Sequence, residues 1–242
     1  MISVRGLAKR FGSTHVLQGL ALEVPAGGSV GILGASGTGK TTLLRLLAGL
    51  EIADAGEIHL CGRPVDSPTQ FVPPHARGLG VVFQRPALWP HLSLGANILF
   101  GVLSRQRAER RGRLERLLVL LELSGLAERR PHELSEGQAR RAALARALAP
   151  EPPVLLLDEP FTNLDSELRA RLVAAVRAEA HRFGATTVLV THEPAEAVAF
   201  AADLQVLEHG VLHPRPPGAT ADSSRGRTAA RGQADPRGEP PP

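Results

Sequence analysis

Residues 34–41 combine glycines, hydroxyl side chains and one lysine in a spacing suited to holding phosphate. The segment reads Gly34-Ala35-Ser36-Gly37-Thr38-Gly39-Lys40-Thr41, and Thr42 follows it at the start of an amphipathic stretch. Glycines let the backbone curl so that successive N–H groups point at phosphate oxygens. In such a loop Lys40 reaches the β- and γ-phosphates, and the hydroxyl of Thr41 binds Mg²⁺. We therefore expect residues 34–42 to bind a nucleoside triphosphate with its metal.

An acidic pair, Asp158-Glu159, follows the apolar run Val154–Leu157. A continuous apolar run is typical of a strand buried on both faces of a parallel sheet, and ligand groups gather at the carboxyl ends of such strands. Asp158 is therefore a candidate Mg²⁺ ligand, and Glu159 is a candidate to polarise the water that attacks a phosphate. Taken alone, both could be solvated turn residues. The glycine-rich segment favours the catalytic interpretation.

Three further residues could complete such a site. Gln84 and His192 each follow an apolar strand-like segment, where an amide and an imidazole could approach a terminal phosphate or its water. Either could equally be an ordinary surface side chain. Phe11 is expected in a glycine-flanked loop and could stack on a base, with core packing as the competing interpretation.

The segment Leu134-Ser135-Glu136-Gly137-Gln138 marks the start of a helix. Ser135 stands at the N-cap and Gln138 three residues later, as in a capping box. Such a helix start also presents N–H groups and the positive end of a dipole, so it can receive a phosphate. In isolation the segment indicates plain capping.

The elements that position these residues alternate along the chain. Apolar periodicity predicts strands over 2–4, 16–24, 29–33, 57–60, 78–83, 154–157 and 186–190, and helices over 40–50, 105–123, 136–149, 166–183 and from Pro194. This order predicts an α/β fold with a mostly parallel sheet. The stretch of about 86–150 is helical and arginine-rich. Residues 213–242 lack large apolar side chains, and we expect a disordered tail there.

Composition excludes several classes of protein. The chain has 242 residues, and none of its apolar runs approaches the roughly 18 residues of a membrane span. Its start has no signal-peptide pattern, and its single cysteine, Cys61, excludes an internal disulfide or a cysteine-built zinc site. The net charge is +4, and half of the excess comes from the final segment. We therefore expect a cytosolic protein without a nucleic-acid partner.

Taken together, the motifs resemble the ATPase domain of the ATP-binding-cassette (ABC) family in order and approximate spacing. The resemblance covers residues 1 to about 212 and rests on Gly34–Thr41, Gln84, Leu134–Gln138, Leu157–Glu159, Asn163–Asp165 and His192. It implies a P-loop NTPase core with a mostly parallel sheet, an N-terminal antiparallel β subdomain and a helical subdomain inserted at about 86–150.

The resemblance also implies residue roles. Phe11 is similar to the aromatic that stacks on adenine, Gln84 to the contact with metal and water, and His192 to the γ-phosphate switch. Asp165 resembles the residue that links two sites across a dimer. The trans contacts to ATP bound by another subunit correspond to Ser135, Gly137 and Gln138. The departures from the family pattern are Arg85, Ala139, and Glu136, where glycine is commoner.

The function implied by the resemblance is that of a Mg²⁺-dependent ATPase subunit, acting as a homodimer on the cytoplasmic face of a bacterial membrane. It would energise solute import through separate permease subunits, together with an extracytoplasmic solute-binding protein. Residues 71–92 look most like importers of ions, polyamines, iron or sugars. Many of those carry an additional C-terminal β-domain, where this chain has only the tail, so the solute stays open. The alternatives are an exporter or lipid-extracting cassette, and a soluble ABC ATPase acting on ribosomes or DNA.

Overall fold

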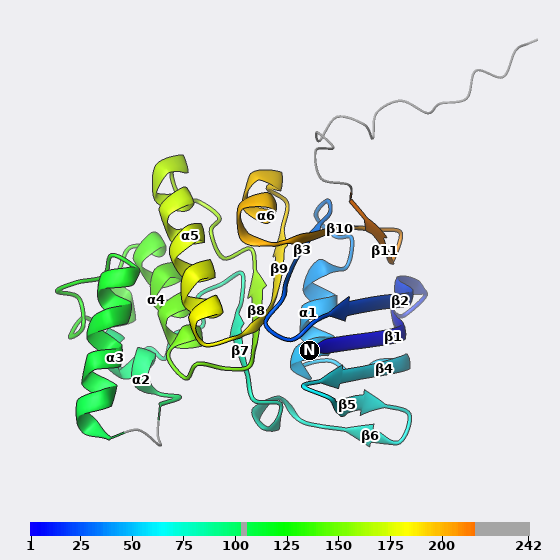
Figure 1. Ribbon diagram of the computed structural model, residues 1–242, viewed down its shortest axis with the longest axis horizontal. Helices are drawn as coiled ribbons and strands as arrows, with labels where there is room; N and C mark the ends of the chain where they lie inside the picture. Colours follow the sequence, from blue (N-terminus) through cyan, green and yellow to red (C-terminus); the bar gives the residue numbers. More distant parts are fainter. Residues whose placement is uncertain (103–105, 216–242) are drawn as a thin grey trace, which may run out of the picture.

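The computed structural model describes residues 1–102 and 106–215, and its centre is a six-stranded sheet (Figure 1). The strand order is β11-β10-β3-β9-β8-β7. All neighbouring pairs are parallel except β10 with β11, which confirms the predicted mostly parallel sheet. The strands are β3 (Ser29–Leu33), β7 (Leu79–Val82), β8 (Val154–Asp158), β9 (Thr186–Thr191), β10 (Asp203–Glu208) and β11 (Val211–Pro214).

A second, antiparallel sheet forms from the N-terminal part of the chain, as predicted. Its order is β2-β1-β4-β5-β6, and its strands are β1 (Ile2–Phe11), β2 (Thr14–Val24), β4 (Ala55–Leu60), β5 (Arg63–Ser67) and β6 (Gln70–Phe71). Helix α1 (Lys40–Ala48) packs between the two sheets, where Leu43, Leu46 and Leu47 are buried. The helix that begins at Lys40 is thus fixed on both sides.

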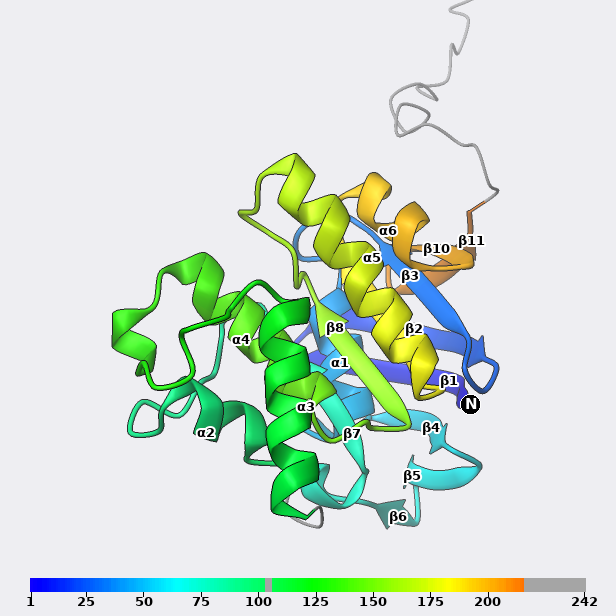
Figure 2. The ribbon, with the colours of Figure 1, turned by 60° about the vertical axis from the view of Figure 1, so that its left-hand side comes forward.

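Five helices share one hydrophobic core with the other face of the central sheet (Figure 2). They are α2 (Leu94–Leu99), α3 (Arg107–Leu120), α4 (Glu136–Leu148), α5 (Ser166–Arg182) and α6 (Pro194–Phe200). Along β8, Leu155 and Leu157 face these helices, whereas Val154 and Leu156 face α1. This alternation explains the continuous apolar run, because each face of the strand has its own core.

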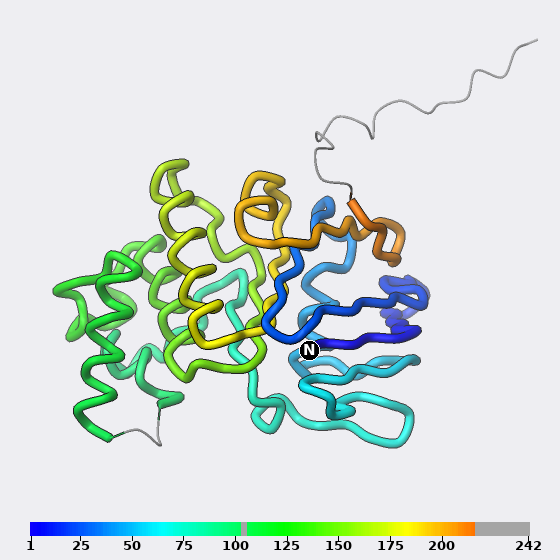
Figure 3. The backbone as a smooth tube through the Cα atoms, in the orientation of Figure 1, coloured from blue at the N-terminus to red at the C-terminus, as the bar shows by residue number. Residues whose placement is uncertain are grey.

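The helices of the predicted insertion all lie in one stretch of chain, between β7 and β8 (Figure 3). Two short 3₁₀ turns, Pro74–Ala76 and Pro131–Glu133, connect elements. In residues 1–102 and 106–215, no helix is long and apolar enough to span a membrane.

Several expectations about individual elements need correction. Strand β1 continues to Phe11 instead of ending at Val4, and β5, β6, β10, β11 and α2 were not predicted. These missed elements have six residues or fewer, too few to show a clear period. Strand β11 extends to Pro214, so the predicted boundary at residue 212 falls within it. The remainder of the predicted tail, 216–242, lies outside the described residues.

Candidate functional site

Four of the predicted segments meet at the carboxyl end of the central sheet. Strand β3 leads into the glycine-rich loop, β8 ends at Asp158, and β9 ends one residue before His192. The register places Leu33 beside Thr191, and Asp158 beside Val190. Gln84 follows β7, the neighbour of β8 on its other side. Adjacent parallel strands therefore deliver all four segments to one edge, where an α/β sheet binds its ligands.

The glycines of the loop are required by its shape. Gly37 and Gly39 have φ values of 82° and 104°, in the left-handed region that favours glycine. A Cβ on Gly39 would lie 2.9 Å from Val16 Cγ1, and a Cβ on Gly34 would lie 2.8 Å from Thr38 Oγ1. Gly39 is also the N-cap of α1 and provides no side-chain cap. The first N–H groups of α1 are therefore oriented for an anion.

Lys40 is buried at the base of this loop. Its ammonium donates hydrogen bonds to Gly34 O and Ala35 O, each at 2.8 Å. Burial lowers the pKa of Lys40, and the negative charges of Glu159 and Asp158 oppose that shift. Its compact charge is thus held within the loop, beside both acidic residues.

Thr41 and Asp158 place two oxygen donors side by side. Thr41 Oγ1 donates to Asp158 Oδ1 at 3.3 Å. Burial raises the pKa of Asp158, while the hydrogen bond from Thr41 and the charge of Lys40 act against this increase. A hydroxyl and a carboxylate are the hard oxygen ligands that Mg²⁺ prefers, so the donor set fits this metal.

Glu159 is the meeting point of three segments. Gln84 Nε2 donates to Glu159 Oε2 at 3.4 Å, and His192 Nδ1 lies 3.3 Å from Glu159 Oε1. The Glu159 backbone has a φ of 47° and donates its N–H to Val190 O at 2.9 Å. A left-handed non-glycine residue is uncommon and often marks a functional site. The predicted trio of Gln84, Glu159 and His192 is therefore assembled within one chain.

A cavity of about 290 Å³ opens between the loop, β1 and Glu159. The lining residues are Phe11, Val16, Ser36, Gly37, Gly39, Lys40, Thr41, Thr42, Gln84 and Glu159. Phe11 ends β1, and 48% of its surface is exposed, so the alternative that it packs in the core is wrong. Lys9 Nζ lies 5.2 Å from the centre of the Phe11 ring. A larger cavity, about 620 Å³, lies against α5 and α6 and is lined by none of the predicted site residues.

The segment Ser135–Gln138 does not line the cavity of its own chain. Ser135 Oγ accepts from Gln138 N at 3.2 Å, and Gln138 Oε1 accepts from Ser135 N at 2.9 Å, which confirms the capping box. A Cβ on Gly137 would meet Leu164 Cδ2 at an ordinary 3.8 Å. The fold of this chain therefore gives no steric reason for glycine at position 137. Asp165 is likewise a capping residue, since its Oδ1 accepts from Leu168 N at 2.9 Å.

Arg140 near the site was not predicted from the sequence, and neither was Val16, which lines the cavity. Arg140 donates from Nη1 to Gln84 O at 3.1 Å and pairs through Nη2 with Glu136 Oε1 at 2.9 Å. The spacing of Glu136 and Arg140 on a helix was a readable signal. The contact with Gln84 was not readable, because it joins segments that are 56 residues apart.

Comparison with known proteins gives consistent matches. A family model described as ABC transporter matches residues 17–162. The chain is 47% identical over 210 residues to an Fe(3+) ions import ATP-binding protein of Mesorhizobium japonicum, covering 86% of this chain and 58% of that protein. It is 44% identical over 217 residues to a sulfate/thiosulfate import ATP-binding protein of Neisseria meningitidis, with coverages of 87% and 60%. The chain thus spans only 58% and 60% of the length of these two relatives.

Solved structures show the same fold. With 28% identity and a TM-score of 0.77, the chain is similar to an ATP-binding cassette in a structure described as a dimeric post-hydrolysis state bound to ADP and Pi. The match covers 88% of this chain and 97% of that one.

Proposed function

Because this chain belongs to the ABC transporter family, we propose that it is the Mg²⁺-dependent ATPase subunit of a transporter. The observation that carries this proposal is the convergence of Gln84, Glu159 and His192 beside Lys40. Gln84, Glu159 and His192 each follow the end of a different central strand. Lys40 begins α1, after the loop that follows β3, so the sheet fixes the separation of all four residues.

ATP binds, in this proposal, along the cavity that runs from Phe11 to Glu159. The exposed ring of Phe11 stacks on adenine, and the N–H groups of residues 34–42 hold the phosphates. Thr41, Asp158 and Gln84 hold Mg²⁺, which when bound offsets the negative charge of the phosphate oxygens. The hydrogen bond between Thr41 and Asp158 supports this assignment, since it brings two of the three ligands together.

Hydrolysis uses Glu159 to orient and polarise the attacking water. Gln84 and His192 hold the carboxylate from two sides, so its position is fixed before ATP binds. Such preorganisation lowers the barrier because no reorganisation is needed during the reaction. His192 then contacts the γ-phosphate as the reaction proceeds.

The complete site is formed by two copies of the chain. Ser135, Gly137 and Gln138 contact the ATP bound by the partner, and Asp165 links the two sites. The capped start of α4, which does not line its own chain's cavity, supports this arrangement, as do the dimers described for similar solved structures.

Import of a small inorganic ion is the transport function that the relatives favour over an exporter, a lipid-extracting cassette or an ATPase acting on ribosomes or DNA. The names of the relatives specify iron and sulfate or thiosulfate import. Such import requires membrane permease subunits and a solute-binding protein, with this chain at the cytoplasmic face of the membrane.

An exposed aromatic pair after Gln84 provides a surface for the permease. The Trp89 and Phe100 rings lie 5.6 Å apart and are both exposed. Asn97 fixes this segment, because its side chain bonds the backbone N–H and carbonyl of Trp89. Exposed apolar residues grouped in this way are typical of an interaction site.

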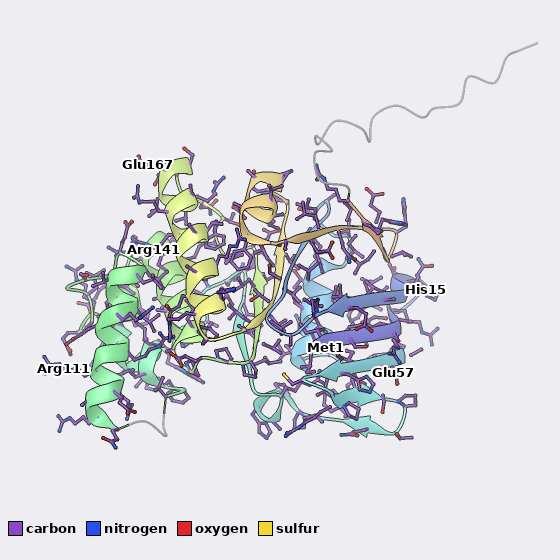
Figure 4. All side chains as sticks on the ribbon, in the orientation of Figure 1. Met1, His15, Glu57, Arg111, Arg141 and Glu167 are labelled. Atoms are coloured by element: carbon purple, nitrogen blue, oxygen red, sulfur yellow. The ribbon has the colours of Figure 1, made fainter. Side chains whose placement is uncertain are left out.

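The substitution Glu159→Gln tests the proposed activity. It replaces the carboxylate with an amide of nearly the same shape that cannot act as a base, so kcat for ATP hydrolysis falls by about 10²–10⁴-fold while ATP binding persists. Phosphate release and nucleotide affinity are measured in parallel. Glu167→Gln serves as the control, because Glu167 is an exposed carboxylate on α5 (Figure 4). Unchanged turnover in Glu159→Gln, or a wild-type chain that hydrolyses no ATP, contradicts the proposal.

A further inference from the structure

Arg140 connects two segments that belong to different sides of the proposed dimer site. It lies one turn into α4, and only 12% of its side chain is exposed. One arm of the guanidinium donates to the carbonyl of Gln84 at 3.1 Å, and the other pairs with Glu136 at 2.9 Å. A planar guanidinium can hold two acceptors in fixed directions. The arrangement therefore ties the backbone at Gln84 to the first turn of α4.

Glu136 extends this connection to a third segment. Its carboxylate is 66% exposed, and the side chain of Asn163 lies close enough to contribute to the lowering of its pKa. The hydrogen bond and charge of Arg140, together with the side chain of Asn163, lower the pKa of Glu136. Asn163 has a left-handed backbone with a φ of 63° and lies two residues before Asp165. The pKa shift and the ion pair both indicate that the charged carboxylate holds Arg140.

We propose that Arg140 and Glu136 form one positioning unit, which couples the chain's own ATP site to the partner's ATP site. This inference rests on the proposed function, in which Gln84 faces the ATP of its own chain while Ser135 and Gly137 face the ATP of the partner. A shift of Gln84 on ATP binding is passed through Arg140 to the start of α4. Two such units, one in each chain, make the two sites of the dimer cooperative.

A second ion pair in the chain serves as a comparison, because it can stabilise only its own helix. Arg111 and Glu115 on α3 have the same spacing and the same 2.9 Å separation. Their side chains are 81% and 61% exposed, and Arg111 lies at the outer edge of the molecule (Figure 4). Pairs of this exposed kind contribute little. Arg140 differs because it is largely buried and also bonds a backbone carbonyl on another segment.

The test compares the full-length wild type with Arg140→Ala, Glu136→Ala, their double variant, Glu136→Gln and the control Arg111→Ala. The first readout is the Hill coefficient of MgATP hydrolysis, whose upper limit is about 2 for two sites. The second is hydrogen exchange of the backbone amides after Gln84, measured without nucleotide. Glu136→Ala removes an exposed carboxylate, so it provides a folded variant even if Arg140→Ala is destabilised.

The expected result is a Hill coefficient that falls towards about 1 in Arg140→Ala and Glu136→Ala, together with faster exchange after Gln84. The double variant loses no more than either single variant, because the two residues act as a unit. Glu136→Gln keeps an oxygen that can accept from Arg140 and so retains cooperativity, as does Arg111→Ala.

Wild-type cooperativity and exchange in both alanine variants would overturn the inference, as would additive losses in the double variant or a wild-type Hill coefficient of about 1. A wild type without ATP hydrolysis contradicts the proposed function instead. In that case hydrogen exchange alone tests whether Arg140 and Glu136 hold the backbone at Gln84. Unchanged exchange in both alanine variants rejects this link.

Discussion

At the residue scale, the most informative position is Glu159, where the chain adopts an unfavourable backbone conformation to aim one carboxylate. A left-handed L-residue costs roughly 1–2 kcal/mol, and the φ of Glu159 is 47°. Its N–H bonds the carbonyl of Val190, so the adjacent strand holds this conformation. The strain is thus maintained by the parallel sheet, and the carboxylate meets Gln84 and His192 without needing to move.

Asp158, the proposed Mg²⁺ ligand, has a pKa that its surroundings shift away from the usual value. Burial raises its pKa, which means that holding it ionised costs stability as the pH rises through the raised value. In the proposed site, a bound Mg²⁺ would offset this cost. With MgATP at about 100 times its Kd, the wild type gains about 2.7 kcal/mol of stability.

We predict that Asp158→Asn abolishes most of the Mg²⁺-dependent part of this stabilisation. Thermal unfolding is measured with ATP in the presence of Mg²⁺ and in the presence of EDTA. Asp66→Asn is the matched control, since Asp66 is also a buried aspartate with a pKa raised by burial, but it lies beside Arg77 in the antiparallel sheet. An equal Mg²⁺ effect in the wild type and Asp158→Asn would remove Asp158 from the metal site.

Individual site residues were predictable where chemistry and local spacing coincide. The glycine-rich loop, Asp158 and Glu159 could be read directly, because each follows a strand-like apolar run. The exposure of Phe11 could not, since its position at the end of a long β1 depends on pairing with β2. Arg140 was missed because its decisive partner is a backbone carbonyl on a distant segment.

At the scale of elements, buried charges join the inserted helices to the rest of the fold. Arg113 on α3 donates to Leu148 O at 2.7 Å at the end of α4 and also forms a short ion pair with Glu179 on α5. Arg116 and Arg182 complete the cluster around Glu179. The helix whose N-terminus carries Ser135 is therefore fixed at its C-terminus by α3 and α5.

We predict that Glu179→Ala lowers the free energy of unfolding by about 3–5 kcal/mol, because it removes the carboxylate that pairs most closely with the buried Arg113. Urea denaturation measures the effect, and Glu167→Ala, which removes an exposed carboxylate from the same helix, changes stability by less than about 0.5 kcal/mol. A loss in Glu179→Ala no larger than in this control would show that the cluster does not stabilise the fold.

The same cluster has a defined pH dependence. Burial alone would raise the pKa of Glu179, but hydrogen bonds from Arg182, Arg113 and Arg116 outweigh it and lower the pKa from 4.5 to about 2. The contribution of this carboxylate is therefore complete above pH 4.5 and is lost as the pH falls towards 2. The stability difference between the wild type and Glu179→Gln should accordingly shrink over that interval.

Long, periodic elements were predictable from the sequence, and short ones were not. The apolar stripe of α1 and the run in β8 have clear patterns that match their buried faces. Strands β5 and β6 contain Pro64 and few apolar residues, so only the pairing of β5 with β4 and of β6 with β5 defines them. Helix α2 had one local signal, the N-cap Ser93, whose Oγ accepts from Ala96 N.

At the scale of the whole molecule, the proposed nucleotide contacts of one chain fall into two groups, and only one of these groups lines the chain's own cavity. The cavity beside Lys40 contains the phosphate-binding loop and Glu159. The capped start of α4 does not line it, and Gly137 has no steric role within the chain. In a symmetric dimer, the start of α4 of each copy would contact the cavity of the other copy, because a two-fold axis makes every contact occur twice.

Mixing two inactive variants tests this central claim most directly. Lys40→Ala removes the ammonium of one half-site, and Ser135→Ala removes the hydroxyl of the other. Each variant alone should hydrolyse ATP at a small fraction of the wild-type rate. The account predicts that the mixture regains activity, because each mixed dimer contains one composite site with both residues intact. If the mixture stays as inactive as its components while wild-type and variant chains exchange partners, the site is built within a single chain and the account is wrong.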